Sequence, residues 1–228
     1  EIIANSPQSS DIDKSILLKK ISYLSTDMFK NTIARRSGWD PLFPRFYSFY
    51  KFSNLQTLEI FFNGFSLCDV NIENYFPKSL KKLAALNVHG SLKWMEHLNE
   101  LKTLVFDDCM DRDNYSKEIK EVSDTESFNY LKNLENLEFT SESFENLDFL
   151  SGCNKLKKIS LKIKGGYYGS PVKLKNIDFL GKLKNIEMFE LTFNEKKHEG
   201  YVYFDTSNLK ILKSCHSLKQ IIINGFKC

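Results

Sequence analysis

Three side chains of this sequence come closest to a reactive cluster. His89, Asp107 and Asp108 would lie near one another if the segments that carry them form adjacent strands. Such a group could hold a metal ion or pass a proton between an imidazole and a carboxylate. A surface ion pair is the simpler interpretation, because charged side chains on exposed strands commonly pair without taking part in any reaction. We therefore expect neither a metal site nor a catalytic pair here.

A glycine-bearing segment, Gly165-Gly166-Tyr167-Tyr168-Gly169, is the second candidate for chemistry. Glycine-rich loops bind phosphate where they join a strand to a helix and are followed by Lys and Ser or Thr. This segment lacks that setting and those residues. The chain also contains no G-x-S-x-G elbow and no H-E-x-x-H pattern. The sequence predicts a protein that is not an enzyme and uses no metal or other cofactor.

The five cysteines are spread through the chain without a C-x-x-C pair. An odd number of distant cysteines makes a poor disulfide framework and a poor zinc site. Free cysteines are often buried as small apolar side chains, which favours a reducing compartment and a cytoplasmic location. The chain begins at Glu1 rather than Met, so secretion after removal of a signal peptide is the alternative.

The composition indicates a folded chain without a dominant charge. Of the 228 residues, 42% are hydrophobic and 27% charged, and the net charge is +3. These values are typical of globular proteins, and so small a charge creates no field that would attract nucleic acid. No apolar run approaches the roughly 20 residues that span a membrane. We expect a soluble protein that binds neither nucleic acid nor membranes.

A repeated pattern, apolar-x-x-apolar-x-apolar, defines the elements that would position all these side chains. Its middle residues, at intervals of 18 to 33 residues, are Leu58, Leu86, Leu104, Leu137, Ile159, Phe189 and Ile221. A second segment, apolar-x-apolar-Leu, precedes several units, as in Ile177-Asp178-Phe179-Leu180. One short strand cannot bury its apolar face alone, but strands stacked about 4.8 Å apart form a parallel sheet over a continuous core.

This pattern resembles the leucine-rich-repeat family, whose units read L-x-x-L-x-L-x-x-N/C over about 20 to 29 residues. The Asn or Cys at the ninth position is present as Asn63, Cys109 and Asn194. The apolar-x-apolar-Leu segment looks most like bacterial internalin-type or phosphatase-regulator-type repeats. The resemblance covers residues 49–226. It implies an α/β solenoid with a curved parallel sheet on the concave face, and with short helices or 3₁₀ turns and loops on the convex face.

Two regions follow along the chain. We expect residues 1–48 to form an N-terminal helical and aromatic cap, and residues 49–228 to form one continuous solenoid of about seven repeats. Residues 12–34 have the apolar spacing of an amphipathic helix, and the aromatic residues of 39–52 would cover the first repeat. At the other end, a missing C-terminal segment and a self-association edge are both open.

The resemblance implies that a protein partner binds the concave face, at outward positions beside the inward leucines. The outward residues that we single out are Glu59, Phe61, Asp107, Asp108, Glu138, Lys162, Glu190 and Phe193; Ala85, Phe62, Ile163 and Met188 are also predicted to point outward. Acidic residues outnumber lysines among the outward positions, which favours a basic partner, although a merely solvated face is the alternative. The exposed aromatic residues favour an interface, unless a register error turns them inward.

Three insertions, at residues 111–125, 164–172 and 195–207, break the period. Each follows a strand, so all three should project from one rim. The second and third contain tyrosines, which add contact area at a low cost in entropy: Tyr167, Tyr168, Tyr201 and Tyr203. We favour this rim over the concave face as the partner site, and we expect the third insertion to fold back as a hairpin.

The sequence therefore predicts a non-catalytic protein-interaction module, expected to be a monomer, in an inhibitor, immunity-type or effector role. Two alternatives stay open. One is a structural or adhesive surface array that assembles through Cys228 and the last strand. The other is a regulatory subunit of an enzyme.

Overall fold

The computed structural model describes residue 20 and residues 22–25, 52–61, 76–86, 92–107, 125–141, 147–164, 172–174, 176–194, 202–203 and 206–225. Several residues singled out above lie outside this part of the chain: Phe62, His89, Asp108, Cys109, Tyr167, Tyr168, Tyr201 and Cys228. For Phe61, Asp107 and Tyr203, only the backbone is described.

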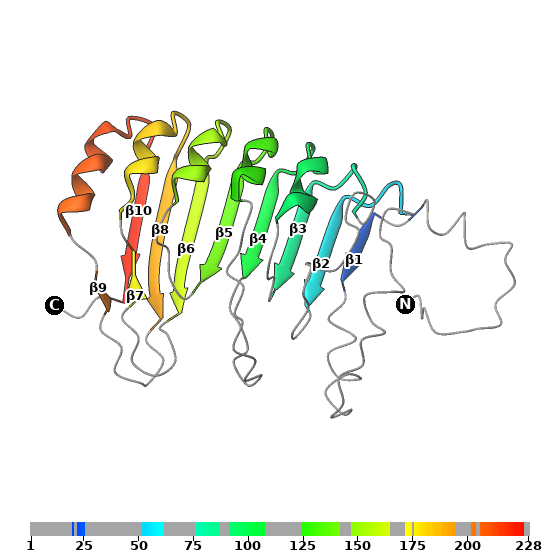
Figure 1. Cartoon of the computed structure of the whole chain (residues 1–228), viewed down its shortest axis with the longest axis horizontal. Helices are drawn as coiled ribbons and strands as arrows, with labels where there is room; N and C mark the ends of the chain where they lie inside the picture. Colours follow the sequence, from blue (N-terminus) through cyan, green and yellow to red (C-terminus); the bar gives the residue numbers. More distant parts are fainter. Residues whose placement is uncertain are drawn as a thin grey trace, which may run out of the picture.

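Within the described residues, eight parallel strands form one open sheet (Figure 1). In chain order they are β1 (Tyr23–Ser25), β2 (Thr57–Phe61), β3 (Lys82–Leu86), β4 (Thr103–Asp107), β5 (Asn136–Ser141), β6 (Lys158–Lys164), β8 (Met188–Asn194) and β10 (Gln220–Asn224). Their order in the sheet follows their order in the chain, as expected when each repeat packs only on its neighbours. The strands from β2 to β10 are those of the seven predicted repeats.

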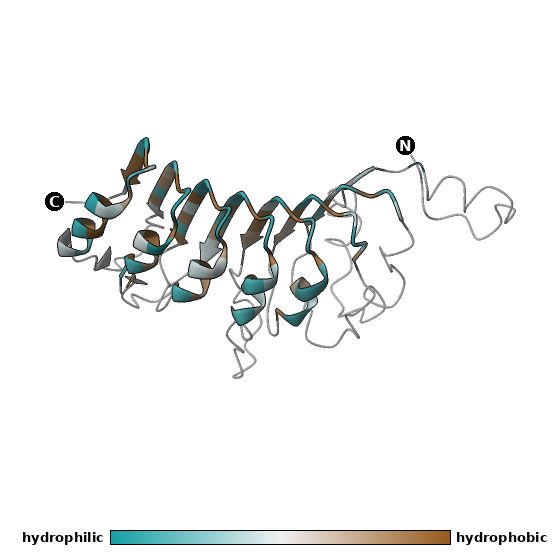
Figure 2. Ribbon diagram, turned by 90° about the horizontal axis from the view of Figure 1, so that it is seen from above, coloured by the Kyte–Doolittle hydropathy of each residue, from teal (hydrophilic) through white to brown (hydrophobic). Residues whose placement is uncertain are grey.

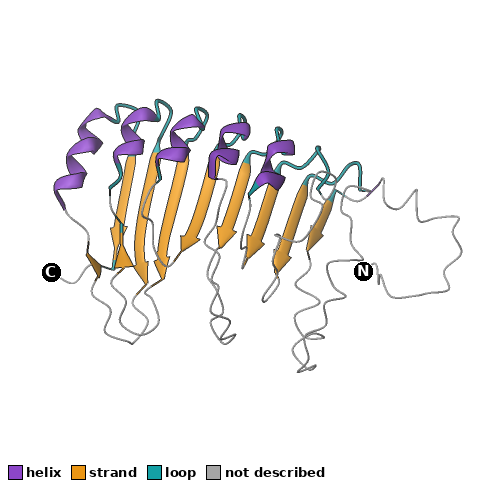
Figure 3. Ribbon diagram, viewed as in Figure 1, coloured by secondary structure: helices purple, strands orange, loops and turns teal. Residues whose placement is uncertain are grey.

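Short 3₁₀ helices form a second layer on one face of the sheet (Figures 2 and 3). They are η6 (Lys93–His97), η7 (Thr125–Tyr130), η8 (Asp148–Gly152), η10 (Asp178–Lys182) and η11 (Thr206–Ser214). The apolar-x-apolar-Leu segment forms this layer. In η10 it buries Phe179 and Leu180, and the Leu180 N–H donates to the Ile177 carbonyl at 3.0 Å. The predicted solenoid, with strands on one face and 3₁₀ turns on the other, is confirmed.

The core lies between the two layers and is built around one apolar position per repeat, which we call the rung position. Through the first six repeats the rung residues are at most 2% exposed, and they are Leu58, Leu83, Leu104, Leu137, Ile159 and Phe189. Two residues further along their strands, Phe106 and Phe139 also point inward, and their rings pack edge to face with centroids 5.0 Å apart. The stack therefore buries its apolar side chains continuously from repeat to repeat.

The rung of β3 differs from the prediction. Leu83, rather than Leu86, pairs with Leu58 and with Leu104. The repeat pattern occurs here twice in overlap, beginning at Leu80 and again at Leu83. The first version buries Leu80, Leu83 and Ala85, which are at most 2% exposed, so it is the version that covers the core. The predicted rung at Leu86 and the predicted outward direction of Ala85 are therefore wrong.

Residues 23–25 form strand β1, although the apolar spacing of residues 12–34 predicted a helix. Leu24 pairs in parallel with Leu58 of β2. An uncovered edge of β2 would leave backbone N–H and C=O groups unpaired, and an extended segment satisfies them. The sheet thus begins within the region predicted as a helical cap, and the helix prediction is wrong at these three residues.

Two of the insertions pair with each other beside the main sheet. Strands β7 (Val172–Lys173) and β9 (Val202–Tyr203) form a separate two-stranded parallel sheet, with Val172 level with Val202. Val202–Tyr203 thus tie the end of the third insertion to the end of the second. The rest of the predicted hairpin, residues 195–201, lies outside the described part of the chain.

Candidate protein-interaction surface

The face of the sheet that points away from the 3₁₀ helices, which we call the strand face, presents its side chains in columns. Residues paired in register on neighbouring strands point to the same side. The first column contains Thr57, Lys82, Thr103, Asn136, Lys158, Met188 and Gln220. The second contains Glu59, Ala84, Val105, Glu138, Ser160, Glu190 and Ile222. This regular array is the surface that a partner would meet.

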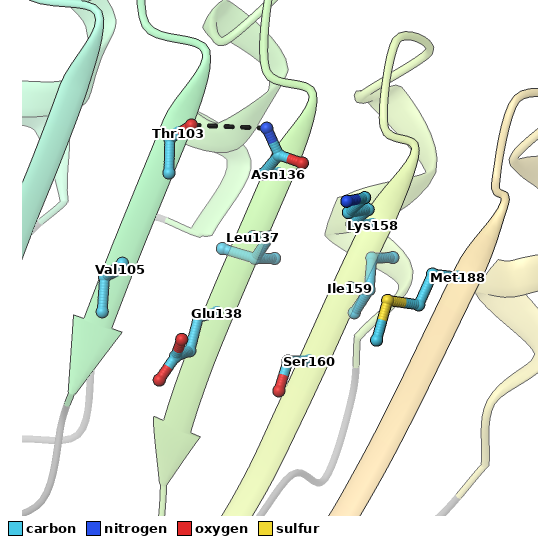
Figure 4. Close-up of a pocket in the computed structure, with 9 residues that line it drawn as sticks. All are labelled: Thr103, Val105, Asn136, Leu137, Glu138, Lys158, Ile159, Ser160 and Met188. Atoms are coloured by element: carbon cyan, nitrogen blue, oxygen red, sulfur yellow. Dashed lines mark hydrogen bonds between the residues drawn. The ribbon is translucent and has the colours of Figure 1, made fainter. Parts of the chain in front are cut away.

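A shallow depression of about 200 Å³ lies on the strand face over β4, β5, β6 and β8 (Figure 4). Its lining residues are Thr103, Val105, Asn136, Leu137, Glu138, Lys158, Ile159, Ser160 and Met188. Val105 and Met188 stand on opposite sides of it, with Glu138 and Ser160 between them (Figure 4). Pockets for small molecules usually enclose about 300 to 1,000 Å³. An open depression of this size suits one or two side chains of another protein better.

The hydroxyl of Ser160 is the least satisfied polar group of the depression. Its oxygen is buried and has no hydrogen-bond partner among the residues that the structure describes. Its neighbours in the second column are Glu138 on one side and Glu190 on the other. Leaving a buried polar group without a partner costs about 1–3 kcal/mol. A ligand group that supplied a hydrogen bond here would recover part of that free energy.

The acidic residues of the strand face differ in how far they are neutralised. Lys82 donates to Glu59 at 2.9 Å and Tyr23 donates to the same carboxylate at 3.0 Å. The hydrogen bond from Lys82 holds the pKa of Glu59 below its usual value, against a smaller opposing effect of burial. Glu138 pairs with Lys162.

Glu190 is the exception among these carboxylates. It accepts a hydrogen bond from the Thr192 hydroxyl at 3.4 Å. Among the residues that the structure describes, no Lys or Arg lies within ion-pair distance of it. Glu190 therefore keeps an unmatched negative charge beside the depression.

The predicted site residues separate into two groups. Glu59, Glu138, Lys162 and Glu190 are half-buried on the strand face, as outward positions require. Phe193 and Ile163 lie in the core, at 3% and 1% exposed. Strands β6 and β8 continue past the repeat pattern, so the inward–outward alternation continues and turns both side chains inward. Their predicted outward direction is wrong.

Sequence reasoning did not single out Ser160, and it missed Lys82 and Ala84. The signal for Ser160 was present, because alignment of the units puts one short polar side chain between two glutamates. Lys82 and Ala84 were missed because the predicted register of β3 was wrong. The pattern that begins at Leu80 puts both of them outward.

Cys153 and Cys215 are free and buried, as the cysteine pattern predicted. Burial raises the pKa of the Cys153 thiol to about 12 and also raises the pKa of Cys215. A thiol with so high a pKa is a poor nucleophile at neutral pH.

Within the described ranges, no group of three or more His, Cys, Asp and Glu residues is placed to hold a metal ion. In the same ranges, no helix has the length and apolar character to cross a membrane.

Comparison with solved structures identifies the architecture. An internalin of Listeria monocytogenes aligns over 94% of this chain and 51% of its own, with a TM-score of 0.54 and 14% identity. A leucine-rich-repeat protein of Leptospira interrogans aligns over 97% of this chain and 48% of its own, with a TM-score of 0.52 and 15% identity. The chain thus spans about half the length of either protein.

No protein-family model and no curated protein sequence matches the chain. The identification therefore rests on the shared architecture together with the repeat pattern. The chain has a parallel sheet in chain order, a 3₁₀ layer and buried rung positions, and its fold aligns with both proteins over more than 90% of its length. This chain has the leucine-rich-repeat solenoid fold.

Proposed function

We propose that this chain is a non-catalytic module that binds a protein partner through the strand face, with the depression over β4–β8 at the centre of the contact. The observation that supports this is the combination of side chains there. Val105 and Met188 provide apolar contact surface. Among the described residues, the Ser160 hydroxyl has no hydrogen-bond partner and the Glu190 carboxylate has no Lys or Arg partner. Protein interfaces typically have such an apolar centre with a few polar groups that find partners on binding.

The chemistry of the depression favours a basic partner segment. A Lys or Arg side chain could lay its aliphatic part against Met188 and place its charged end between Ser160 and Glu190. Its N–H groups would donate to the Ser160 hydroxyl oxygen and to the Glu190 carboxylate. Lys158 lines the same depression. Its charge would repel further basic residues of the partner, so a single basic side chain close to Glu190 fits this position better than a basic cluster.

The rim is the second part of the proposed surface. Tyr203 lies in β9, and the β7–β9 pair joins the two insertions that carry the four predicted tyrosines. On this proposal, a partner seated on the strand face near β8 contacts the rim as well.

Site-directed photo-crosslinking tests the proposal. The photo-reactive amino acid benzoylphenylalanine replaces Met188 in one variant and Glu126, an exposed residue of η7, in a matched control. In extracts of the source cells, we expect position 188 to yield a discrete crosslinked protein that unlabelled chain competes away, whereas position 126 yields none. Glu190→Lys should lower the crosslinking yield about tenfold or more, as loss of a buried charge pair at an interface does, while Glu126→Lys should not.

Equal crosslinking from positions 188 and 126 would contradict the strand face as the binding surface. Insensitivity of the crosslink to Glu190→Lys would contradict the basic partner segment while leaving the strand face in place.

A further inference from the structure

The turns that lead into the strands lie side by side along one edge of the sheet (Figure 3). In the second to sixth repeats, the turn and the two residues before the strand are 78–81, 99–102, 132–135, 154–157 and 184–187. We call these five segments the turn edge. Each of these repeats has another repeat on both sides, so their exposure does not depend on where the chain begins or ends.

The turn edge carries an excess of positive charge. It contains seven lysines and three glutamates, although the whole chain has a net charge of only +3. Lys102 and Lys157 share one carboxylate, that of Glu135, at 3.6 and 2.9 Å. The other five lysines are exposed, and among the described residues no carboxylate lies within ion-pair distance of them: Lys78, Lys81, Lys132, Lys155 and Lys184.

Side-chain hydrogen bonds hold these turns in a fixed stack. The Asn133 side-chain amide donates to the Asn99 carbonyl at 2.8 Å, and the Asn185 amide donates to the Asn154 carbonyl at 2.7 Å. Between them, the Lys155 ammonium group donates to the Asn133 side-chain oxygen at 2.7 Å. The lysine-bearing turns therefore cannot move apart to relieve their mutual repulsion. A surface that is already ordered loses little conformational entropy when a partner binds.

The spacing of the lysines matches one face of an α-helix. Lys132, Lys155 and Lys184 belong to three consecutive repeats, whose turns lie about 4.8 and 9.6 Å from the first. Positions i, i+3 and i+7 of a helix share a face and lie about 4.5 and 10.5 Å along its axis from the first. Side chains on one face of an extended strand are about 6.8 Å apart, which fits the lysines less well.

We propose that the turn edge is a docking surface for an acidic α-helix of a partner protein, which lies across the turns and places carboxylates against Lys132, Lys155 and Lys184. The charges of the two surfaces are complementary, and opposite charges across an interface favour association and fix its register. The turn edge is separate from the depression on the strand face, so this proposal goes beyond the proposed function.

Nucleic acid and membranes fit the turn edge less well than a protein helix does. Its five segments contain no Arg and no aromatic residue, which are the side chains that commonly contact or stack on bases. A continuous polyanion would also meet the three glutamates, whereas a protein can place neutral residues there. The apolar side chains of the turn edge are all 0% exposed, so none is available to enter a bilayer: Leu80, Leu101, Leu134, Leu156 and Ile186.

The experiment compares two alanine-rich helical peptides of about 18 residues, which are about 27 Å long. Both contain five glutamates, placed on one face at i, i+3, i+7, i+10 and i+14 in the first peptide and spread around the helix in the second. Each is titrated into ¹⁵N-labelled chain at about 0.1 M salt, where charges more than about 10 Å apart are screened. We expect the largest amide shifts at Lys132, Lys155 and Lys184, and about fivefold weaker binding of the second peptide.

A matched pair of triple variants separates the turn edge from net charge. The test variant replaces Lys132, Lys155 and Lys184 with Gln. The control replaces three exposed lysines of the 3₁₀ layer with Gln: Lys93, Lys210 and Lys213. Both lose three positive charges from exposed positions, so both should keep the circular dichroism spectrum of the parent chain. The test variant should bind the first peptide about tenfold more weakly, and the control should stay within about twofold.

Further probes decide the class of partner. Phosphatidylserine vesicles and a single-stranded polyuridylate should bind the parent chain more weakly than the first peptide does. Tighter binding of either probe that the test variant loses would assign the turn edge to a membrane or to nucleic acid, and would overturn the proposal. Equal binding of the two peptides, equal losses in the two triple variants, or shifts confined to other surfaces would overturn it too. Glu190→Lys, which tests the strand face, should not weaken peptide binding, so the two proposals can fail separately.

Discussion

At the level of single residues, exposure of the rung side chain decides how much each repeat contributes to stability. Leu104 is completely buried between the rungs of the adjacent strands, whereas Ile221 is 46% exposed. The free energy gained by burying an apolar side chain grows with the area removed from water. In a closed core, a truncated side chain also leaves a cavity whose walls lose contacts.

Leu104→Ala and Ile221→Ala should therefore differ in cost. We expect the first to lower the free energy of unfolding by about 3 kcal/mol, and the second to lower it by about 1 kcal/mol or less. Urea denaturation followed by circular dichroism measures both. Val105→Ala, at the outward position beside Leu104, is the control and should change stability little. Equal losses at residues 104 and 221 would show that the end of the stack is covered.

Which side chains point inward could largely be predicted from the sequence, because alternation along a strand is a local rule. Leu58, Leu104, Leu137, Ile159 and Phe189 all follow it. Phe193 and Ile163 were misplaced because the rule holds only as far as the strand extends, and strand length depends on pairing with the neighbour. The unpaired hydroxyl of Ser160 could not be predicted, since hydrogen-bond partners come from adjacent strands.

At the level of strands, a column of alternating charge links successive repeats. Its residues stand immediately before the last five strands of the main sheet and are Lys102, Glu135, Lys157, Glu187 and Lys219. The hydrogen bond from Lys157, with a smaller contribution from Lys102, holds the pKa of Glu135 below its usual value. Lys219 lowers the pKa of Glu187 in the same way. The pKa of Lys157 is raised, chiefly by its hydrogen bond to Glu135. A carboxyl whose pKa is lower in the folded state stabilises the fold above its unfolded pKa. That contribution is lost as the pH falls through the folded pKa.

The thermal stability of the chain should consequently fall below about pH 4.5, where these carboxylates begin to take up protons. Glu135→Gln should lower the melting temperature slightly at pH 7, and the difference from the parent chain should shrink as the pH falls. Calorimetry across this range gives the comparison. Glu126→Gln, which removes an exposed carboxylate of η7, should show no such trend. A difference in melting temperature between Glu135→Gln and the parent chain that stays constant with pH would mean that the ion pairs of Glu135 do not contribute to stability.

Strand positions could be predicted for most repeats because the apolar pattern is sufficient to define them. It was insufficient at β3, where two overlapping versions of the pattern compete and only burial of Leu80 and Ala85 decides between them. It also missed β1, whose three residues are placed by the open edge of β2 rather than by their own spacing. In both cases the deciding interaction is with another repeat.

Over the whole molecule, the architecture could be predicted because a solenoid is built from contacts between neighbours in the chain. Eight strands follow one another in order, and the 3₁₀ layer follows the same order. The β7–β9 pair could not be predicted, because it joins two insertions that lie outside the repeat pattern. The candidate surfaces depend on the order of the strands. The strand face exists only if the repeats stack in the observed register.

Disulfide trapping between strands tests that register directly. Cysteine pairs at Ala84 with Val105 and at Val105 with Glu138 join register partners on adjacent strands, about 4.8 Å apart and within the Cα separation that a disulfide accepts. Val105 with Ser160 spans two strands, about 10 Å, and is the negative control. Under mild oxidation, with bonds assigned by mass spectrometry, we expect the first two pairs to form and the third to stay reduced. A bond between cysteines at positions 105 and 160 would show that the repeats do not stack as one ladder in this order. A bond from position 105 to a cysteine at Asn87, in preference to one at Ala84, would show that β3 follows the predicted register with Leu86 at the rung position.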